Sequence, residues 1–196
     1  MEITTNQIKE LRDRTGVSVM QCKKALEEAG GDNEKAIIIL QKNSKNIAQK
    51  KSDRTLGAGI IQSYVHGTGT VGTLVELSCE TDFVAKNAEF KTLAYDIAMH
   101  IAATDPEFLK KSDVSSEARQ KASEVFAKEA EGKPEDIKMK IIEGKLSAYF
   151  GEKTLMEQPF IKNPDLKISN LIESAVQKFG EKIEIARFVR FSVLQK

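Results

Sequence analysis

The strongest constraint on the fold is a change from strand-like to helix-like spacing of apolar residues near residue 80. Between Val71 and Cys79, apolar or β-branched side chains recur at every second position, as in a strand that buries one face. Between Phe90 and Ile101, apolar side chains recur at every third or fourth position, as in an amphipathic helix. A strand is therefore predicted to pass into a helix through a short connection, residues 80–87.

This connection carries an aromatic ring beside an acid. Asp82 and Phe83 are adjacent in a segment that neither pattern explains. One interpretation is that Phe83 packs onto the protein's own core while Thr81 or Asp82 caps a helical turn. The other is that the pair contacts another molecule, because loops run over the surface and often carry function. Spacing alone leaves both interpretations open.

Composition narrows the class of protein. The chain has 196 residues, enough for one large domain or two small ones. Its net charge is only +1, so no basic field predicts binding to nucleic acid or to an anionic membrane. No apolar run approaches the roughly 20 residues that cross a bilayer, and the N-terminus resembles neither a secretory signal nor a transit peptide. We therefore expect a cytoplasmic protein.

The cysteines give no sign of metal or thiol chemistry. Cys22 and Cys79 have no Cys or His partner at metal-ligand spacing, so we expect two reduced, partly buried thiols and no metal site. A nucleophile formed by Cys79 and His66 is conceivable, but no oxyanion-hole signature accompanies this pair. We expect no catalytic residues and no cofactor.

Residues 1–42 predict three short helices, each with its own start signal. Thr4, Ser18 and Asp32 stand at N-cap positions, and the first two precede a glutamine at the spacing of a capping box. Helices this short must pack on one another, which predicts a small three-helix domain that offers a docking surface. The basic residues 43–56 predict a linker, for which helical structure is one option.

The remainder of the chain predicts an antiparallel sheet of about three strands covered by helices. The patterns are strand-like over 60–66, 70–79 and 183–193, and helical over 87–103, 115–131, from Pro134 onward and over 169–180. Residues 151–160 look like a loop. Arg187 interrupts the apolar face of the last strand, which predicts an acidic partner or an open sheet edge there. The fold class is therefore α+β.

We divide the chain into a three-helix domain with its linker, residues 1–54, and a core domain, residues 55–196. Val19 and Met20 lie at the turn between the first two helices of the smaller domain. The flexible thioether of Met20 suits an adaptable contact surface, yet a methionine at this spacing also suits a core. Both interpretations of Met20 remain open at this point.

Several motifs, in order along nearly the whole chain, resemble the signatures of the elongation factor Ts family. They are Thr15-Gly16 with Met20–Leu26, Tyr64–Gly67, Cys79–Asn87, Ile97–Ala103, and Gly151-Glu152 with Gln158–Phe160. The chain departs from the long bacterial form in being shorter, with one strand–helix core unit and no coiled-coil insertion. Val19 also stands where many members have a second methionine.

The resemblance implies guanine-nucleotide exchange on the translation GTPase elongation factor Tu, without covalent chemistry. In the family, a small N-terminal domain similar to ubiquitin-associated (UBA) domains docks on the GTPase, and the core adds contacts. The matching positions in this sequence are Arg12, Val19, Met20, Lys23 and His66.

A second contact implied by the resemblance lies near the partner's magnesium site. The segment that would enter there is Thr81, Asp82, Phe83 and Val84. The shorter form is similar to members that dimerise through the core, so a homodimer is also implied. The alternative function is a UBA-like adaptor that binds a different partner.

Overall fold

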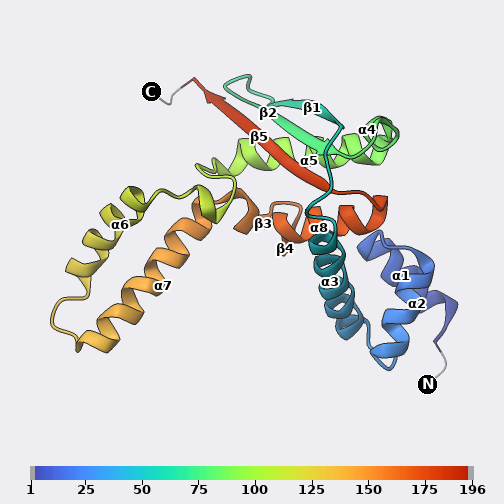
Figure 1. The fold of residues 1–196 in the computed structure, drawn as a ribbon, viewed down its shortest axis with the longest axis horizontal. Coiled ribbons are helices and arrows are strands. Elements are labelled where there is room, and N and C mark those ends of the chain that lie inside the picture. The colour runs from blue at the N-terminus through green and yellow to red at the C-terminus, as the bar shows by residue number, and fades with distance from the viewer. Residues whose placement is uncertain (1–2, 194–196) are drawn as a thin grey trace.

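The computed structural model, which describes residues 3–193, is built around an antiparallel sheet of three strands (Figure 1). The strands are β1 (Ala58–Val65), β2 (Val71–Cys79) and β5 (Ile183–Ser192), and β2 lies between the other two. The turn of the predicted β1–β2 hairpin includes Gly69, whose φ of 70° favours glycine. The prediction of a mixed fold with a three-stranded antiparallel sheet is confirmed.

Two helices cover the inner face of the sheet (Figure 1): α5 (Ala88–Thr104) packs against β1 and β2, and α8 (Ile168–Phe179) packs against β5. Asn87 caps α5 as predicted, its side-chain oxygen accepting the N–H of Glu89 at 2.8 Å. Burial of one large apolar side chain stabilises a fold by about 2 kcal/mol. The fully buried members of this main core include Val75, Leu77, Phe90, Ile97, Ile101 and Ile168.

Three helices form a second, smaller core near the N-terminus. They are α1 (Thr5–Thr15), α2 (Val19–Glu28) and α3 (Asn33–Lys50). The predicted caps are present: Thr4 completes a capping box on α1, while Ser18 and Asp32 accept N–H groups from the first turns of α2 and α3. The buried side chains between the helices are Leu11, Val17, Cys22, Ala25, Leu26, Ala36 and Leu40.

Helix α3 is longer than predicted and takes up much of the predicted linker, residues 43–56. Its C-terminal half packs against α8 and the main core: Ser44 is buried and hydrogen-bonds Gln177 of α8, and Ile47 contacts the core. These inward positions are spaced by about one helical turn. Because one of them is the polar residue Ser44, the sequence does not show a complete apolar stripe here. The division at residue 54 stays a prediction.

A pair of helices, α6 (Ser116–Glu129) and α7 (Glu135–Lys153), projects away from the sheet (Figure 1). Phe126 of α6 packs edge-on against Tyr149 of α7, with ring centroids 5.8 Å apart. The helices predicted over 115–131 and from Pro134 onward are confirmed by this pair. The two helices pack mainly on each other, and α7 also contacts η2, so few of their side chains are buried and their apolar stripes are thin.

The segment between α7 and α8, predicted as a loop over 151–160, is more ordered than expected. α7 continues through its first residues, and α8 starts directly after a short strand, so Ser169 is not its cap. Gly180 ends α8 as predicted. The remaining elements are η1 (Lys111–Asp113), η2 (Leu155–Glu157), and the paired strands β3 (Pro159–Phe160) and β4 (Asn163–Lys167). Between residues 3 and 193, no helix has both the length and the apolar character that a membrane span requires.

His100 of α5 is completely buried and links α5 to the segment after α7. Its Nε2 lies 3.0 Å from Oε1 of Gln158, and its Nδ1 accepts the N–H of Ile161 at 3.4 Å. This pattern fits a neutral imidazole with its proton on Nε2. Burial lowers the pKa of His100, and the hydrogen bond to Gln158 offsets part of that effect.

The buried imidazole should make stability depend on pH. The unfolded chain binds a proton at the ordinary histidine pKa of about 6.5, whereas the folded chain binds it only at lower pH. The contribution of His100 is therefore complete above that pH and decreases as pH falls toward the lowered value. In urea unfolding, His100→Gln should lose less free energy of unfolding between pH 7 and pH 5 than the unchanged protein. His66→Gln is the control, and equal losses for His100→Gln and the unchanged protein would contradict the prediction.

Candidate functional site

The connection between β2 and α5 contains a short helix, α4 (Asp82–Lys86). Five residues are too few for a helical periodicity to be recognised, so the sequence predicted only a connection. Val84 and Ala85 lie in the main core, with Val84 only 4% exposed. They hold the inner side of α4 against the sheet, and the other side of the helix faces outward.

Phe83 lies on the outward side and is 81% exposed. The interpretation that Phe83 packs onto the protein's own core is therefore wrong. Asp82 is exposed beside it, and its carboxylate accepts a hydrogen bond from Nζ of Lys86 at 2.6 Å. This ion pair lowers the pKa of Asp82, so the group is a carboxylate at neutral pH. An uncovered aromatic ring beside a fixed negative charge is suited to binding another molecule.

Thr81 precedes α4 but its side chain does not cap the helix. Its hydroxyl instead donates to Oε1 of Glu181, which lies in the turn between α8 and β5, at 2.5 Å. Of the four residues predicted in this segment, Thr81, Asp82 and Phe83 are exposed and Val84 is buried.

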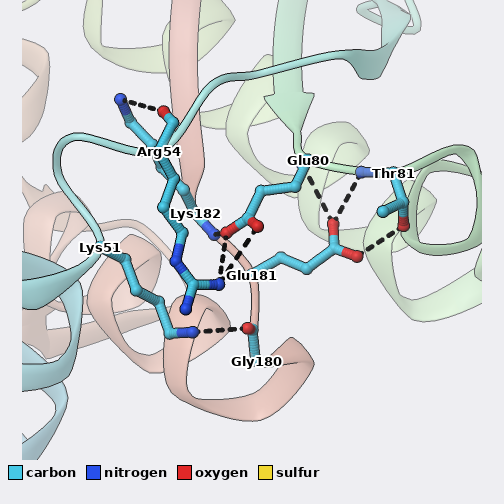
Figure 2. Close-up of polar contacts among 7 residues, drawn as sticks. All are labelled: Lys51, Arg54, Glu80, Thr81, Gly180, Glu181 and Lys182. Carbon is cyan, nitrogen blue, oxygen red and sulfur yellow. Dashed lines mark hydrogen bonds and ion pairs between the residues drawn. The ribbon is translucent and has the colours of Figure 1, made fainter.

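Figure 2 shows the polar contacts that hold the base of this segment. The carboxylate of Glu181 accepts the N–H groups of Glu80 and Thr81, each at 3.0 Å. The carboxylate of Glu80 accepts the N–H of Lys182 at 2.5 Å and two contacts from Arg54 at 3.2 Å. The N–H of Lys182 is the main cause of a lowered pKa for Glu80, and Arg54 adds to it. Sequence reasoning missed Arg54 and Glu181, because no local pattern links residues so distant in the chain.

The four positions predicted on the N-terminal helices are all exposed, at the end of α1 and the start of α2: Arg12, Val19, Met20 and Lys23. Met20 is 64% exposed, so the interpretation of Met20 as a core residue is wrong. The neighbouring Val17 fills the core position instead. In the view of Figure 1, α1, α2 and α4 lie on the same side of the molecule.

His66 is exposed at the β1–β2 turn, where its Nδ1 lies 3.2 Å from the hydroxyl oxygen of Tyr64. Cys79 is at the opposite end of the hairpin, because it pairs with Ala58. At about 3.3 Å per residue, the length of the strand separates the two side chains, so they form no nucleophilic pair. Burial raises the pKa of the Cys79 thiol.

Both Cys79 and Cys22 are free and buried. Among residues 3–193, His, Cys, Asp and Glu side chains form no cluster that could hold a metal ion.

The outer face of the sheet is apolar and uncovered. Arg187 lies on this face, and its Nε is 2.7 Å from a carboxylate oxygen of Glu76 on the neighbouring strand. The sequence predicted an acidic partner for Arg187 or an open sheet edge. Glu76 is that acidic partner, and β5 is also an edge strand. A hollow of about 240 Å³ lies beside this ion pair. The exposed apolar side chains on this face are Ile61, Val65, Leu74, Val189 and Phe191.

Comparison with known proteins places the chain among translation factors. The family model described as Elongation factor TS matches residues 5–195. The chain is 50% identical over 193 residues to the elongation factor Ts of Carboxydothermus hydrogenoformans, covering 97% of this chain and 89% of that protein. It is 50% identical over 196 residues to that of Thermodesulfovibrio yellowstonii, covering 100% and 98%. It is 49% identical over 193 residues to that of Thermosipho melanesiensis, covering 97% and 98%.

Because Phe83 faces outward and Val84 faces the core, replacing Val84 should lower stability much more than replacing Phe83. Phe83→Ala should change the free energy of unfolding by less than about 0.5 kcal/mol, because the exposed ring has few contacts to lose. Val84→Ala should lower it by about 2 kcal/mol, because it leaves a cavity in the core. Urea unfolding of the two variants measures both values. A larger loss for Phe83→Ala than for Val84→Ala would contradict the geometry of α4.

Proposed function

The chain belongs to the elongation factor Ts family, and on this premise we propose that it is a guanine-nucleotide exchange factor for the translation GTPase elongation factor Tu. Membership of the family makes it a translation elongation factor. The observation that carries the proposal is the uncovered ring of Phe83 beside the carboxylate of Asp82 on a helix held rigidly from below. We expect it to act in the cytoplasm.

Phe83 supplies binding energy that can be used to deform the partner. A phenylalanine that enters an apolar pocket contributes about 2 kcal/mol and can separate the elements that line the pocket. Asp82 brings a negative charge near a site that holds magnesium and phosphate. A carboxylate there repels the bound phosphates and competes for the metal. Both effects weaken GDP binding.

Exchange of this kind needs no covalent chemistry, so we propose no catalytic residue and no cofactor. The factor has only to bind the nucleotide-free partner more tightly than the loaded one. By linkage, bound nucleotide then weakens the factor by the same ratio, so incoming GTP displaces it. A fixed protruding side chain is sufficient for this role.

The N-terminal helices would hold the partner while the α4 segment acts. Arg12, Val19, Met20 and Lys23 are exposed on one end of a compact three-helix core, which we propose to be UBA-like. The flexible side chain of Met20 suits an adaptable interface. His66 adds an exposed polar contact on the core.

Thr81 and Val84 serve the same contact from within the protein. Val84 is buried, so its proposed contribution is to fix the outward direction of Phe83. The hydroxyl and the backbone N–H of Thr81 are both bound by Glu181, which leaves its methyl group for the partner.

We also propose a homodimer in which the outer faces of two sheets pack together. Isolated apolar patches on a monomer are small, and a sheet face with several exposed large apolar side chains indicates an interface. The ion pair of Glu76 with Arg187 neutralises the charges on this face, so a second copy could cover it without leaving a charge unpaired.

Replacement of Phe83 tests the exchange function. Phe83→Ala should slow GDP release from elongation factor Tu about tenfold or more, since 1.4 kcal/mol of differential binding corresponds to a factor of ten. Stopped-flow fluorescence of a labelled GDP measures the rate.

Two variants serve as controls for this experiment. Val125→Ala removes an exposed apolar side chain from α6, and Cys79→Ser removes the buried thiol; both should leave the release rate unchanged. If Phe83→Ala releases GDP as fast as the unchanged protein, the proposed mechanism fails, and the alternative of a UBA-like adaptor with a different partner is favoured.

The proposed dimer is tested by placing a charge on the sheet face. Phe191→Asp should convert the dimer to a monomer, because the interface would have to bury an unpaired carboxylate. Multi-angle light scattering measures the mass. Met139→Asp, at an exposed position of α7, is the matched control and should remain dimeric. A monomeric unchanged protein with full exchange activity would refute the dimer.

A further inference from the structure

We propose that Glu181 is a positioning residue: its carboxylate fixes the direction in which Asp82 and Phe83 are presented to the partner. This inference rests on the proposed exchange function and adds a residue to it. Glu181 lies outside the exposed segment and about a hundred positions away in the sequence, and it acts through the backbone of Glu80 and Thr81.

The carboxylate of Glu181 makes three hydrogen bonds to two consecutive residues (Figure 2). Oε2 accepts the N–H of Glu80 and the N–H of Thr81, each at 3.0 Å. Oε1 accepts the hydroxyl of Thr81 at 2.5 Å. Three hydrogen bonds to two consecutive residues fix the orientation of the segment at its start.

These bonds pair two backbone N–H groups that lie just beyond the end of a strand ladder, while the carbonyl of Thr81 accepts the N–H of Ala85 and the thiol of Cys79. The ladder between β2 and β5 ends where Cys79 pairs with Ile183. Thr81 follows in an extended conformation and does not cap α4 through its side chain. A helix as short as α4 has little stability of its own, so its direction depends on the residues at its ends. Val84 anchors its middle, and Glu181 anchors its start.

A reciprocal contact makes Glu181 itself well placed. Glu80 reaches back across the same gap and accepts the N–H of Lys182, so each chain segment binds the other through a glutamate (Figure 2). Arg54 donates to Glu80, and Lys51 donates to the carbonyl that precedes Glu181 at 2.7 Å. These contacts hold the turn after α8 against the end of β2. The backbone from which the side chain of Glu181 extends is therefore held in place.

Two substitutions separate hydrogen-bond geometry from charge. Glu181→Gln removes the charge but can keep all three contacts: its carbonyl oxygen accepts the two N–H groups, and its amide donates to the hydroxyl of Thr81, which can also accept. Glu181→Asp keeps the charge, but its side chain is one methylene too short to reach the same groups. A positioning role therefore predicts that Gln is tolerated and Asp is not, and an electrostatic effect on the partner predicts the reverse.

The test compares Glu181→Ala, Glu181→Gln and Glu181→Asp with the unchanged protein and with Glu143→Ala, which removes an exposed carboxylate from α7. Stopped-flow release of labelled GDP from elongation factor Tu gives the maximal rate and the half-saturating concentration. Ala and Asp should lower the maximal rate about tenfold, since freeing one residue's backbone costs about that factor. The half-saturating concentration should change less than about threefold, because docking through the N-terminal helices is untouched. Gln and the control should stay close to the unchanged protein.

A second measurement does not depend on the partner. Amide hydrogen exchange of Glu80 and Thr81, followed by NMR in the free protein, should become at least about tenfold faster in the Ala and Asp variants and little faster in Gln. The amides of Ile97 and Ile101 in α5 report whether each variant is folded, and they should stay protected.

The outcomes are distinguishable. Unchanged GDP release and unchanged amide protection in Glu181→Ala would overturn the proposal, as would a variant series in which Asp is active and Gln is not. If amide exchange rises as expected while Phe83→Ala does not slow GDP release, Glu181 still holds the segment, and it is the proposed exchange function that fails.

Discussion

The pairing of the central strand β2 with both β1 and β5 is the constraint on which the rest of the structure depends. β1 is its neighbour in sequence, but β5 comes from the C-terminal end, so this ladder closes the core around α5 and α8. The same ladder brings the turn after α8 beside the end of β2. Without the pairing of β2 with β5, the carboxylate of Glu181 would not lie within hydrogen-bonding distance of the backbone of Thr81.

From this base, α4 shows how a buried residue can serve an exposed one. Val84 and Ala85 pack into the core, and because α4 is helical, the preceding Phe83 must face away from it. The ring of Phe83 is exposed to water, but the backbone of α4 that carries it is held in place by Val84 and Ala85. A rigid, preorganised side chain loses little entropy on binding, which suits a factor that acts by binding alone.

Two other surfaces remain uncovered, and they differ in kind. The outer sheet face is largely apolar, and the ion pair between Glu76 and Arg187 on it is formed within the chain, which favours a second copy as its partner. The α6–α7 pair instead projects with a thin, aromatic seam between Phe126 and Tyr149. It contributes little to the main core, so it can vary in length without disturbing the sheet.

The sequence by itself determined the local features. Thr4, Ser18 and Asn87 were predicted as caps and are caps, because an N-cap depends only on residues within one turn. The spacing of apolar residues within each element was enough to predict the hairpin, the third strand and the three N-terminal helices. The motif carrying Asp82 and Phe83 was also visible as a segment that fitted neither period.

Tertiary structure alone decided what depends on distant residues. Whether Phe83 and Met20 were core or surface could not be settled, because a side chain's burial depends on what packs over it. Helical structure in residues 43–50 was only one option from the sequence, because the inward face of α3 there meets α8 through polar side chains such as Ser44. The three bonds of Glu181 could not be predicted for the same reason: they join the end of β2 to the turn before β5, and no local pattern records a contact between segments a hundred residues apart.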